Sequence, residues 1–257
     1  QVPSKLIGYD AFQETDITGI TLPITKHSYL VTKVEDIMPA MKEAFILAKS
    51  GRPGPVLVDI TKDAQQAKTD WAWDPSPVKL RGYRPTLTVA KSAILSAADL
   101  LAKSKRPVIL AGQGILQSGA MKEVQQFAEL INAPVAMTLL GLGGFPASHP
   151  LHIAMMGMHG ESWVNHAIQE ADLLIALGMR FDDRVTGNIK TYAVNAKKIH
   201  IDIDPSEINK NVLADAAIVA DLREALKDLL DVVKPADHKP WLEYIGSMKG
   251  TSAGHDI

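Results

Sequence analysis

The sequence predicts an α/β protein with a central doubly wound parallel sheet, preceded by the C-terminal part of a second α/β domain. Short, continuously apolar segments such as "PVILAG" and "DLLIALG" alternate with segments whose apolar residues recur at helical spacing. Strands that are apolar throughout are typical of parallel sheets that helices cover on both faces. A proline-containing stretch without periodicity, residues 67–87, separates this alternating region from the first part of the chain.

The composition favours a small-molecule partner over nucleic acid or a membrane. The 257 residues include 27 Lys and Arg against 29 Asp and Glu, so the formal net charge is -2 and there is no basic footprint. No apolar run approaches the roughly 20 residues of a membrane span. The chain has 0 cysteines, which excludes disulfides, thiolate metal sites and cysteine nucleophiles. The histidines lack ligand partners at usable spacing, so no metal site is predicted in this chain.

Residues 1–66 are interpreted as the end of the first domain. Apolar residues at helical spacing predict a helix from Glu35 to Ser50, and Gly51 ends it. The stretch "RPGPVLVDITKD" predicts a turn, a short buried strand and a polar exit. Residues 67–87 are then expected to form a linker.

Residues 88–233 are expected to form the second domain, and Asp221 begins its last helix with Glu224 three residues on, the spacing of a capping box. Residues 234–257 are interpreted as another linker, which opens a further helix and leads toward a domain outside this sequence. The elements expected in the second domain are a helix from Val89 to Lys103, the strand "PVILAG", a helix from Gly119 to Ile131, the strand "APVAMTL", a helix near Trp163 to Glu170, the strands "DLLIALG", "KIHIDI" and "AIVA", and the last helix.

Glycines, arginines and carboxylates gather where these strands are expected to end. Ligands of open parallel sheets bind outside the carboxyl ends of the strands. Glycine allows close approach to a phosphate, an arginine fork suits pyrophosphate or carboxylate, and a carboxylate suits ribose hydroxyls. The residues that directly follow these strands, here called the strand exits, therefore predict a dinucleotide site. Its expected residues are Gly112, Gln113, Gly114, Thr138, Leu139, Gly178, Met179, Arg180, Asp182, Asp183, Arg184, Asp202, Ile203 and Asp204.

These patterns leave the ligand open. The segment "GQGILQSG" is not the G-x-G-x-x-G of an NAD site, and Asp202 follows it by about 90 positions rather than roughly 20. It also lacks the G-K-[ST] of a P-loop. A lone G-x-G also fits a plain strand-to-helix turn, and "RFDDR" also fits a solvated loop with internal ion pairs. His159 in "GMHG" fits either a site residue or a loop histidine.

Five motifs carry a closer resemblance: "IGYDAFQETDITGIT", "SGRPGPVLVDITKD", "GMHG", "GMRFDDRVTGN" and "IHIDIDPSEINKN". In this order they resemble the large catalytic subunits of acetolactate synthases (acetohydroxyacid synthases), a family of thiamine-diphosphate enzymes. The resemblance implies three domains, of which the first and third hold thiamine diphosphate and Mg²⁺ and the central one binds FAD. The family's cofactor-activating glutamate and its "GDG…N" magnesium motif have no match in this sequence, so we expect the fragment alone to be inactive.

The family reaction condenses two pyruvates, or pyruvate with 2-ketobutyrate, with loss of CO2 in the synthesis of valine, leucine and isoleucine. By motif match, Phe12 and Gln13 lie beside the thiamine and Lys62 lines the substrate channel. Met158 and Arg184 resemble the pair that recognises the second ketoacid. The FAD contacts carry over to Arg52, Gly112, Gln113, Gly114, Thr138, Leu139, His159, Gly178, Met179, Arg180, Asp182, Arg184, Asp202, Ile203 and Asp221.

The same resemblance implies herbicide contacts at Pro3, Lys62, Met158 and Asp183. Ser4 and Lys5 replace the two arginines of plant members, so herbicide sensitivity is not carried over and the form looks bacterial. A homodimer or tetramer is expected, in the cytoplasm, or in a plastid if the source is eukaryotic. A regulatory small subunit is a candidate partner. Two alternatives stay open: another thiamine enzyme such as glyoxylate carboligase, and a non-catalytic flavin-binding module.

Overall fold

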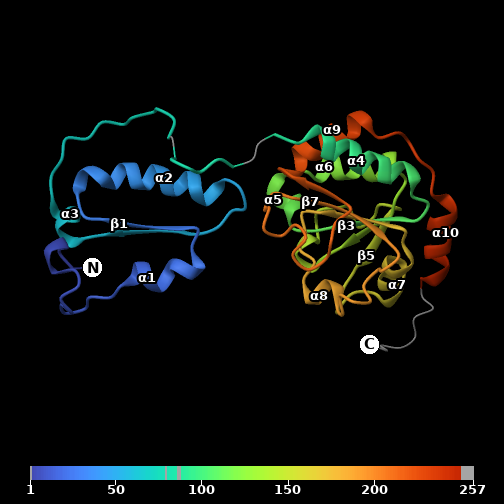
Figure 1. The fold of residues 1–257 in the computed structure, drawn as a ribbon, viewed down its shortest axis with the longest axis horizontal. Coiled ribbons are helices and arrows are strands. Elements are labelled where there is room, and N and C mark those ends of the chain that lie inside the picture. The colour runs from blue at the N-terminus through green and yellow to red at the C-terminus, as the bar shows by residue number, and fades with distance from the viewer. Residues whose placement is uncertain (1, 79, 86–87, 250–257) are drawn as a thin grey trace. The chain divides into compact units, whose positions relative to one another are not determined.

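The chain divides into two compact units, residues 1–85 and residues 86–257 (Figure 1). The computed structural model describes residues 2–78, 80–85 and 88–249. The boundary between the units lies inside the expected linker 67–87. Within the described residues, no helix combines the length and the apolar character needed to cross a bilayer.

The first unit is built on two parallel strands, β1 (His27–Val31) and β2 (Val56–Ile60), paired from His27 with Val56 to Val31 with Ile60. The predicted helix is α2 (Ile37–Lys49), which begins after a short 3-10 turn and buries Ala40, Ala44 and Leu47. Its shorter helical elements are η1 (Ser4–Leu6), α1 (Ile17–Thr21), η2 (Leu22–Ile24), η3 (Val34–Asp36) and α3 (Lys62–Gln66).

The segment that follows α3 packs against α2. Lys42 of α2 donates from Nζ to the carbonyl oxygens of Asp74 at 2.6 Å and Ser76 at 3.2 Å. The same ammonium lies 5.5 Å from the ring centroid of Trp73, a cation–π distance. The described part of residues 67–87 contains no helix or strand, and these contacts fasten it to the first unit.

The second unit is a six-stranded, fully parallel sheet in the order β5-β4-β3-β6-β7-β8. In chain order this is 3-2-1-4-5-6, the doubly wound arrangement whose direction reverses between β3 and β6. The α/β class with a parallel sheet is therefore confirmed. Its elements are α4 (Lys91–Lys103), β3 (Pro107–Ala111), α5 (Gly114–Ser118), α6 (Met121–Leu130), β4 (Val135–Met137), η4 (Leu139–Gly141), β5 (His152–Met155), α7 (Ser162–Glu170), β6 (Leu173–Leu177), α8 (Asp183–Thr186), β7 (Lys197–Asp202), β8 (Ala216–Val219), α9 (Leu222–Val232) and α10 (Lys239–Met248).

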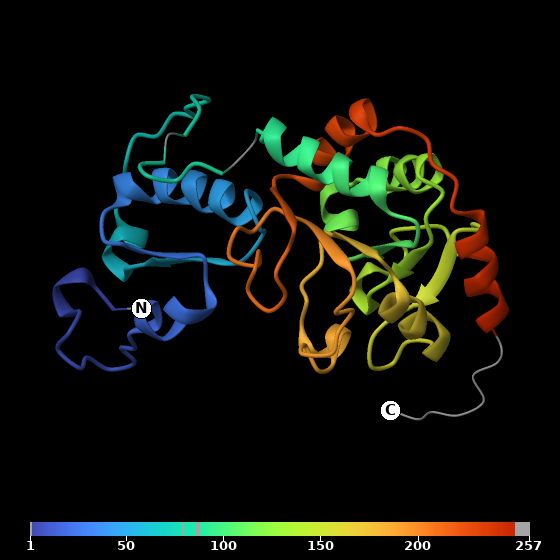
Figure 2. The same ribbon diagram turned by 45° about the vertical axis from the view of Figure 1, so that its right-hand side comes forward.

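Helices cover both faces of this sheet, with α4, α6 and α9 above it and α7 below it in Figure 1, and Figure 2 turns the sheet between these layers. Successive residues of a strand point alternately into the two hydrophobic cores, one on each face of the sheet. Ile109 and Ile175 pack with α4, α6 and α9, whereas Leu110 and Leu174 pack with α7. Each such fully buried aliphatic side chain contributes about 1.5–3 kcal/mol, which explains why these strands are apolar at every position.

Two expectations for this unit need correction. The helix expected from Gly119 to Ile131 begins at Met121, because Gly119 has φ 67 and ends the separate, unpredicted helix α5. β5 was not predicted as a strand. The further helix expected after residue 234 is α10, which buries Trp241 and Ile245 in the core shared with α7.

Candidate functional site

All six strands of the second unit run parallel, so their carboxyl ends lie along one edge of the sheet. This edge carries most of the residues that the sequence singles out. Gly112, Gln113 and Gly114 follow β3, Thr138 and Leu139 follow β4, and Met158 and His159 follow β5; Gly178, Met179, Arg180 and Asp182 follow β6, Asp202 and Ile203 end β7, and Asp221 follows β8.

The exits of β3 and β6 are in backbone contact at the point where the strand order reverses. The Gly114 amide donates to the Gly178 carbonyl at 2.9 Å, and Gly178 has φ 57. A Cβ on Gly112 would lie 2.3 Å from the Gly178 oxygen, and a Cβ on Gly114 would lie 2.6 Å from the Gly178 Cα. Only glycine allows this approach, so the G-x-G after β3 is more than a flexible turn.

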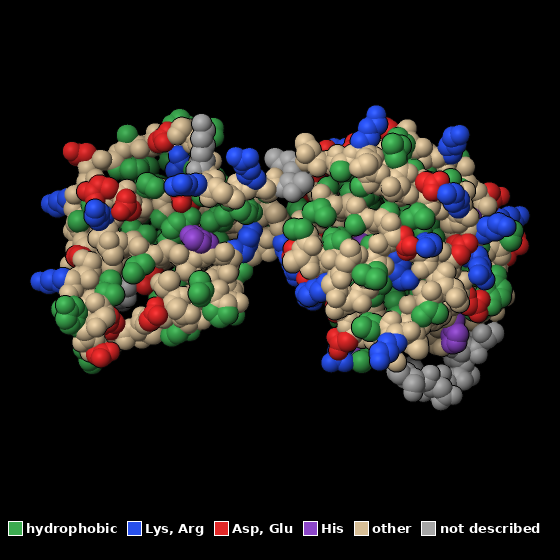
Figure 3. All heavy atoms as spheres, viewed as in Figure 1, with side chains coloured by type: hydrophobic (Ala, Val, Ile, Leu, Met, Phe, Trp, Pro, Cys, Tyr) green, Lys and Arg blue, Asp and Glu red, His purple; other side chains and the backbone are tan. Residues whose placement is uncertain are grey.

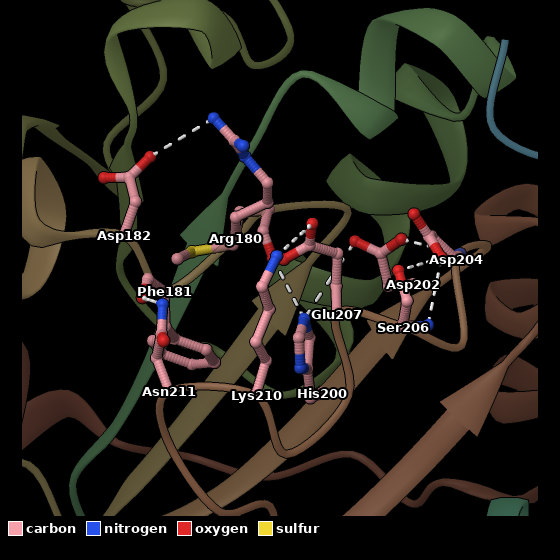
Figure 4. A network of polar contacts seen from close by, with 11 residues as sticks. Arg180, Phe181, Asp182, His200, Asp202, Asp204, Ser206, Glu207, Lys210 and Asn211 are labelled. Atoms are coloured by element: carbon pink, nitrogen blue, oxygen red, sulfur yellow. Dashed lines mark hydrogen bonds and ion pairs between the residues drawn. The ribbon is translucent and has the colours of Figure 1, made fainter. Parts of the chain in front are cut away.

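The loop after β6 is held by its carbonyl groups. Besides Gly178, the Met179 carbonyl lies 2.9 Å from Nε2 of His200, and the Phe181 carbonyl accepts from Nδ2 of Asn211 at 2.8 Å (Figure 4). Among the described residues, no acceptor is found for the backbone amides of residues 179–182, and Met179 and Phe181 are buried. Unpaired amides in buried backbone are costly, so this loop offers donors to a ligand or to solvent.

Charged side chains surround the loop without strong internal pairing. Arg180 lies 3.6 Å from Asp182, Arg184 lies 3.9 Å from Asp183, and both arginine side chains are at least half exposed. Exposed ion pairs of this length contribute little stability. Asp182 also caps α8 by accepting from the amides of Arg184 at 3.1 Å and Val185 at 3.2 Å. The guanidinium groups thus remain accessible to an anion.

The loop after β5 meets α8. The Met158 amide donates to the Arg184 carbonyl at 2.8 Å, and Nη1 of Arg184 lies 3.5 Å from the Met158 sulfur. Asn165 of α7 clamps Gly157 by accepting from its amide at 2.9 Å and donating to its carbonyl at 3.0 Å. The structure therefore brings together Met158 and Arg184, which the sequence paired; His159 beside them is exposed.

A register shift in the edge strand precedes this loop. Val135 pairs with His152 but Met137 pairs with Met155, so β5 has one residue more than β4 over this stretch. Ala154 takes up the extra length with φ 72. Such bulges bend the chain beside functional sites, and this one directly precedes the loop that contacts α8.

Several predicted carboxylates and hydroxyls organise the backbone. Asp221 caps α9 by accepting from the amide of Arg223 at 2.9 Å, while Glu224 pairs with Lys227 at 2.7 Å. Thr138 accepts from the Gly141 amide at 3.0 Å, and Asp202 accepts from the Asp204 amide at 2.9 Å. These groups shape the exits of β4, β7 and β8.

Four of the residues predicted to contact thiamine, ketoacid or FAD lie in the first unit. Phe12 is 89% exposed in the loop before α1, and Gln13 beside it has φ 61. Lys62 begins α3, and its amide donates to the Val2 carbonyl at 3.2 Å. Arg52 is exposed in the turn after α2. The chain thus presents Phe12 and Gln13 on one loop and Lys62 at a helix start.

No role was predicted for His200, Asn211, Gly157 or Asn165, although they hold the loops that carry the predicted residues. His200 was the most detectable, because it interrupts the apolar strand "KIHIDI". Its burial lowers its pKa, and the hydrogen bond to Met179 and the charges of Asp202 and Glu207 oppose that shift. No cluster of three or more metal-ligating side chains occurs among the residues that the structure describes.

Acidic and basic side chains are intermixed on the face of the second unit drawn in Figure 3. Broad single-sign surfaces attract nucleic acid or membranes, and this face is not of that kind. It is a mixed surface around a parallel sheet whose strand exits hold the predicted site residues.

Comparison with known proteins assigns the chain that carries this edge to a family. Residues 94–229 match the model described as "Thiamine pyrophosphate enzyme, central domain". The chain is 49% identical over 254 residues to the acetolactate synthase large subunit of Corynebacterium glutamicum, covering 97% of this chain and 40% of that protein. It is 49% identical over 257 residues to the probable acetolactate synthase large subunit of Methanocaldococcus jannaschii, covering 98% and 44%.

A plant relative, acetolactate synthase 1, chloroplastic, of Zea mays, is 47% identical over 249 residues, covering 95% of this chain and 38% of that protein. The chain thus spans less than half the length of these relatives. The matched residues 94–229 run from α4 to α9 and include every strand of the parallel sheet. The chain belongs to the thiamine pyrophosphate enzymes, and its second unit contains their central domain.

Proposed function

We propose that this chain is part of an acetolactate synthase large subunit that condenses two pyruvates, or pyruvate with 2-ketobutyrate, with loss of CO2. Identity of 46–49% to bacterial and archaeal large subunits over nearly the whole chain supports this reading. It favours acetolactate synthase over glyoxylate carboligase or a non-catalytic flavin module. Within that enzyme, residues 1–66 would end the thiamine-binding domain and residues 88–233 would be the FAD domain.

The observation that carries the FAD assignment is the loop after β6. The carbonyls of Gly178, Met179 and Phe181 are held by protein donors, the amides of residues 179–182 have no acceptor among the described residues, and Arg180 extends from the same loop. Backbone amides and an arginine fork are the donors that a pyrophosphate group requires. The glycine contact between the β3 and β6 exits fits the close approach of a dinucleotide at a switch point.

The Met158 and Arg184 contact supports a role in choosing the second ketoacid. The Arg184 guanidinium suits the ketoacid carboxylate, and the Met158 thioether beside it suits a short alkyl group. In this proposal Phe12 and Gln13 orient the thiamine side of the reaction, and Lys62 lines the approach. Thiamine diphosphate, when bound with Mg²⁺, supplies the carbanion chemistry, while the protein binds and orients the ketoacids.

FAD has no redox task in this overall reaction, so we assign it a structural role. A redox-silent flavin analogue should then support full activity of the complete enzyme. Loss of activity with the analogue would contradict this assignment.

The complete enzyme is proposed to act as a homodimer or tetramer, with a regulatory small subunit as a candidate partner. Bacterial and chloroplastic relatives fit a cytoplasmic or plastid setting. Branched-chain amino acid synthesis is the proposed pathway.

A graft tests the activity. These 257 residues would replace the matching segment of the Corynebacterium glutamicum large subunit, which supplies the rest of the chain. The graft should restore growth of a large-subunit deletion strain without valine and isoleucine and should form acetolactate from pyruvate. A soluble graft of the correct oligomeric size that forms no acetolactate would contradict the proposal; the unmodified large subunit is the control.

A further inference from the structure

His200 is a polar residue inside an otherwise apolar strand. It is 0% exposed, while its neighbours Ile199 and Ile201 pack into the opposite core. A buried imidazole is costly unless its nitrogens are hydrogen-bonded or the residue has another role. Only one of its ring nitrogens has a partner, because Nδ1 is buried without one among the described residues.

The partnered nitrogen fixes the tautomer, and burial, which lowers the pKa of His200, favours the neutral ring. Nε2 lies 2.9 Å from the Met179 carbonyl oxygen, which can only accept, so Nε2 carries the proton and donates. Nδ1 is then the unprotonated nitrogen of a neutral ring. The Phe181 ring lies edge-on at 5.2 Å between centroids, and the Asp202 carboxylate lies 4.0 Å from Nε2. Figure 4 shows the imidazole rising from β7 toward the loop that carries Arg180.

This single hydrogen bond orients a peptide unit. The described residues contain no cis peptide bonds, and in a trans peptide the C=O and N–H groups point in opposite directions. Because the Met179 carbonyl points at His200, the Arg180 amide points away from it. The bonds from Gly114 to the Gly178 carbonyl and from Asn211 to the Phe181 carbonyl act in the same way on the amides of Met179 and Asp182.

We propose that His200 is a positioning residue for dinucleotide pyrophosphate: by donating to the Met179 carbonyl, it turns the Arg180 amide toward the ligand and fixes the base of the Arg180 side chain. The inference rests on the proposed flavin site and names the group of the cofactor that His200 serves. His200 itself touches no ligand. Of the three donors that hold this loop, it is the one whose side chain is wholly buried.

Three variants of the 257-residue chain test this role. His200→Gln keeps an N–H near the position of Nε2, whereas His200→Leu keeps the bulk and removes the donor. Ile168→Val, in the same core on α7, is the control for a small loss of packing away from the loop. Each variant is titrated with FAD by fluorescence quenching, and hydrogen exchange at residues 179–182 is followed without ligand.

His200→Leu should raise the dissociation constant for FAD about tenfold, while His200→Gln and Ile168→Val should stay within about threefold of the parent chain. Exchange at residues 179–182 should change in His200→Leu and not in His200→Gln. Parent-like affinity in His200→Leu, or equally weak binding by the Leu and Gln variants, would overturn the proposal.

The two claims fail separately. If the parent chain binds no FAD, the flavin site of this chain is wrong, and the exchange measurement alone decides the role of His200. Unchanged exchange at residues 179–182 in a folded His200→Leu chain would then overturn it.

Discussion

The Met158 amide donates a 2.8 Å hydrogen bond to the carbonyl of Arg184, and the Arg184 guanidinium lies 3.5 Å from the Met158 sulfur. Two loops that follow different strands, β5 and β6, are thereby joined through backbone and side chain together. A cation and a soft apolar group are presented side by side. That combination matches a ligand with a carboxylate and a short alkyl chain.

Replacing Arg184 should affect the ketoacid more than the flavin. In the grafted enzyme, Arg184→Ala removes a charge-assisted hydrogen bond worth about 1.5–3 kcal/mol, so use of 2-ketobutyrate should fall about tenfold or more. The kcat/KM for 2-ketobutyrate measures this effect, and a FAD titration measures the other. Lys190→Ala, exposed beyond α8, is the control. Equal losses in ketoacid use and FAD affinity would contradict the division of roles.

Gly157 should be irreplaceable for the joint between the two loops. It has φ 93, and a Cβ there would lie 2.6 Å from the Arg184 carbonyl oxygen. Gly143 is a matched control, because it has φ 90 with nothing within 4 Å of its Cβ position. Gly143→Ala should cost about 1–3 kcal/mol for backbone strain alone, and Gly157→Ala should cost more. Urea unfolding measures the free energy of unfolding of both variants. A smaller loss of stability in Gly157→Ala than in Gly143→Ala would contradict the prediction, because it would show that the backbone around Arg184 shifts at little cost.

Asp172 should stabilise the amino ends of β3 and β6. Its carboxylate accepts from Ser104 Oγ at 2.5 Å and from the amides of Lys105 at 2.8 Å and Arg106 at 3.0 Å. Burial raises its pKa, but these bonds outweigh burial and hold the pKa below its ordinary value. Asp172→Asn should therefore cost about 1–3 kcal/mol at pH 7.

The loss of stability in Asp172→Asn should depend on pH. A lowered carboxyl pKa stabilises the fold above the unfolded pKa, near 3.9, and this contribution is lost as the pH falls through the folded value. The gap in unfolding free energy between the parent and Asp172→Asn should shrink below about pH 4. A gap that stays constant from pH 7 to pH 3 would contradict the role of the ionised carboxylate.

His200 should make the fold sensitive to mild acid. Burial lowers its pKa, against the opposing charges of Asp202 and Glu207, and Glu207 is itself paired with Lys210 at 3.3 Å. The unfolded chain then takes up the proton first, so stability should decline as the pH falls below about 6.5. Chemical unfolding from pH 8 to pH 5 should show a smaller decline in His200→Gln. An identical decline in both chains would contradict a neutral His200.

The interior strands of the second unit's sheet could be predicted from the sequence, because burial on both faces requires apolar residues along the strand. β5 was missed for the converse reason: it is an edge strand with half-buried positions, and its extra residue, Ala154, adopts a backbone conformation that no pattern indicates for alanine. A further helix was expected after residue 234, and α10 lies there with Trp241 and Ile245 four residues apart on one helical face.

The sequence predicted the site residues that follow the ends of strands, because parallel strands bring their carboxyl ends to one edge. It did not predict the groups that orient those residues. Asn211 comes from a loop after β7, and the pairing of Gly114 with Gly178 depends on a strand order that no local pattern encodes. The contact of Met158 with Arg184 joins loops after two different strands, and the bulge at Ala154 and the hydrogen bonds of Asn165 beside it are likewise not encoded in a local pattern.

The most direct measurement is a fluorescence titration of the 257-residue chain with FAD, with NAD and ATP as controls. The strand-exit account predicts saturable quenching by FAD alone, weakened about tenfold or more in Arg180→Ala, because a charge-assisted hydrogen bond to the pyrophosphate is lost. Absence of FAD binding by the folded chain, or equal binding of NAD and ATP, would contradict a flavin site built from the exits of β3 and β6.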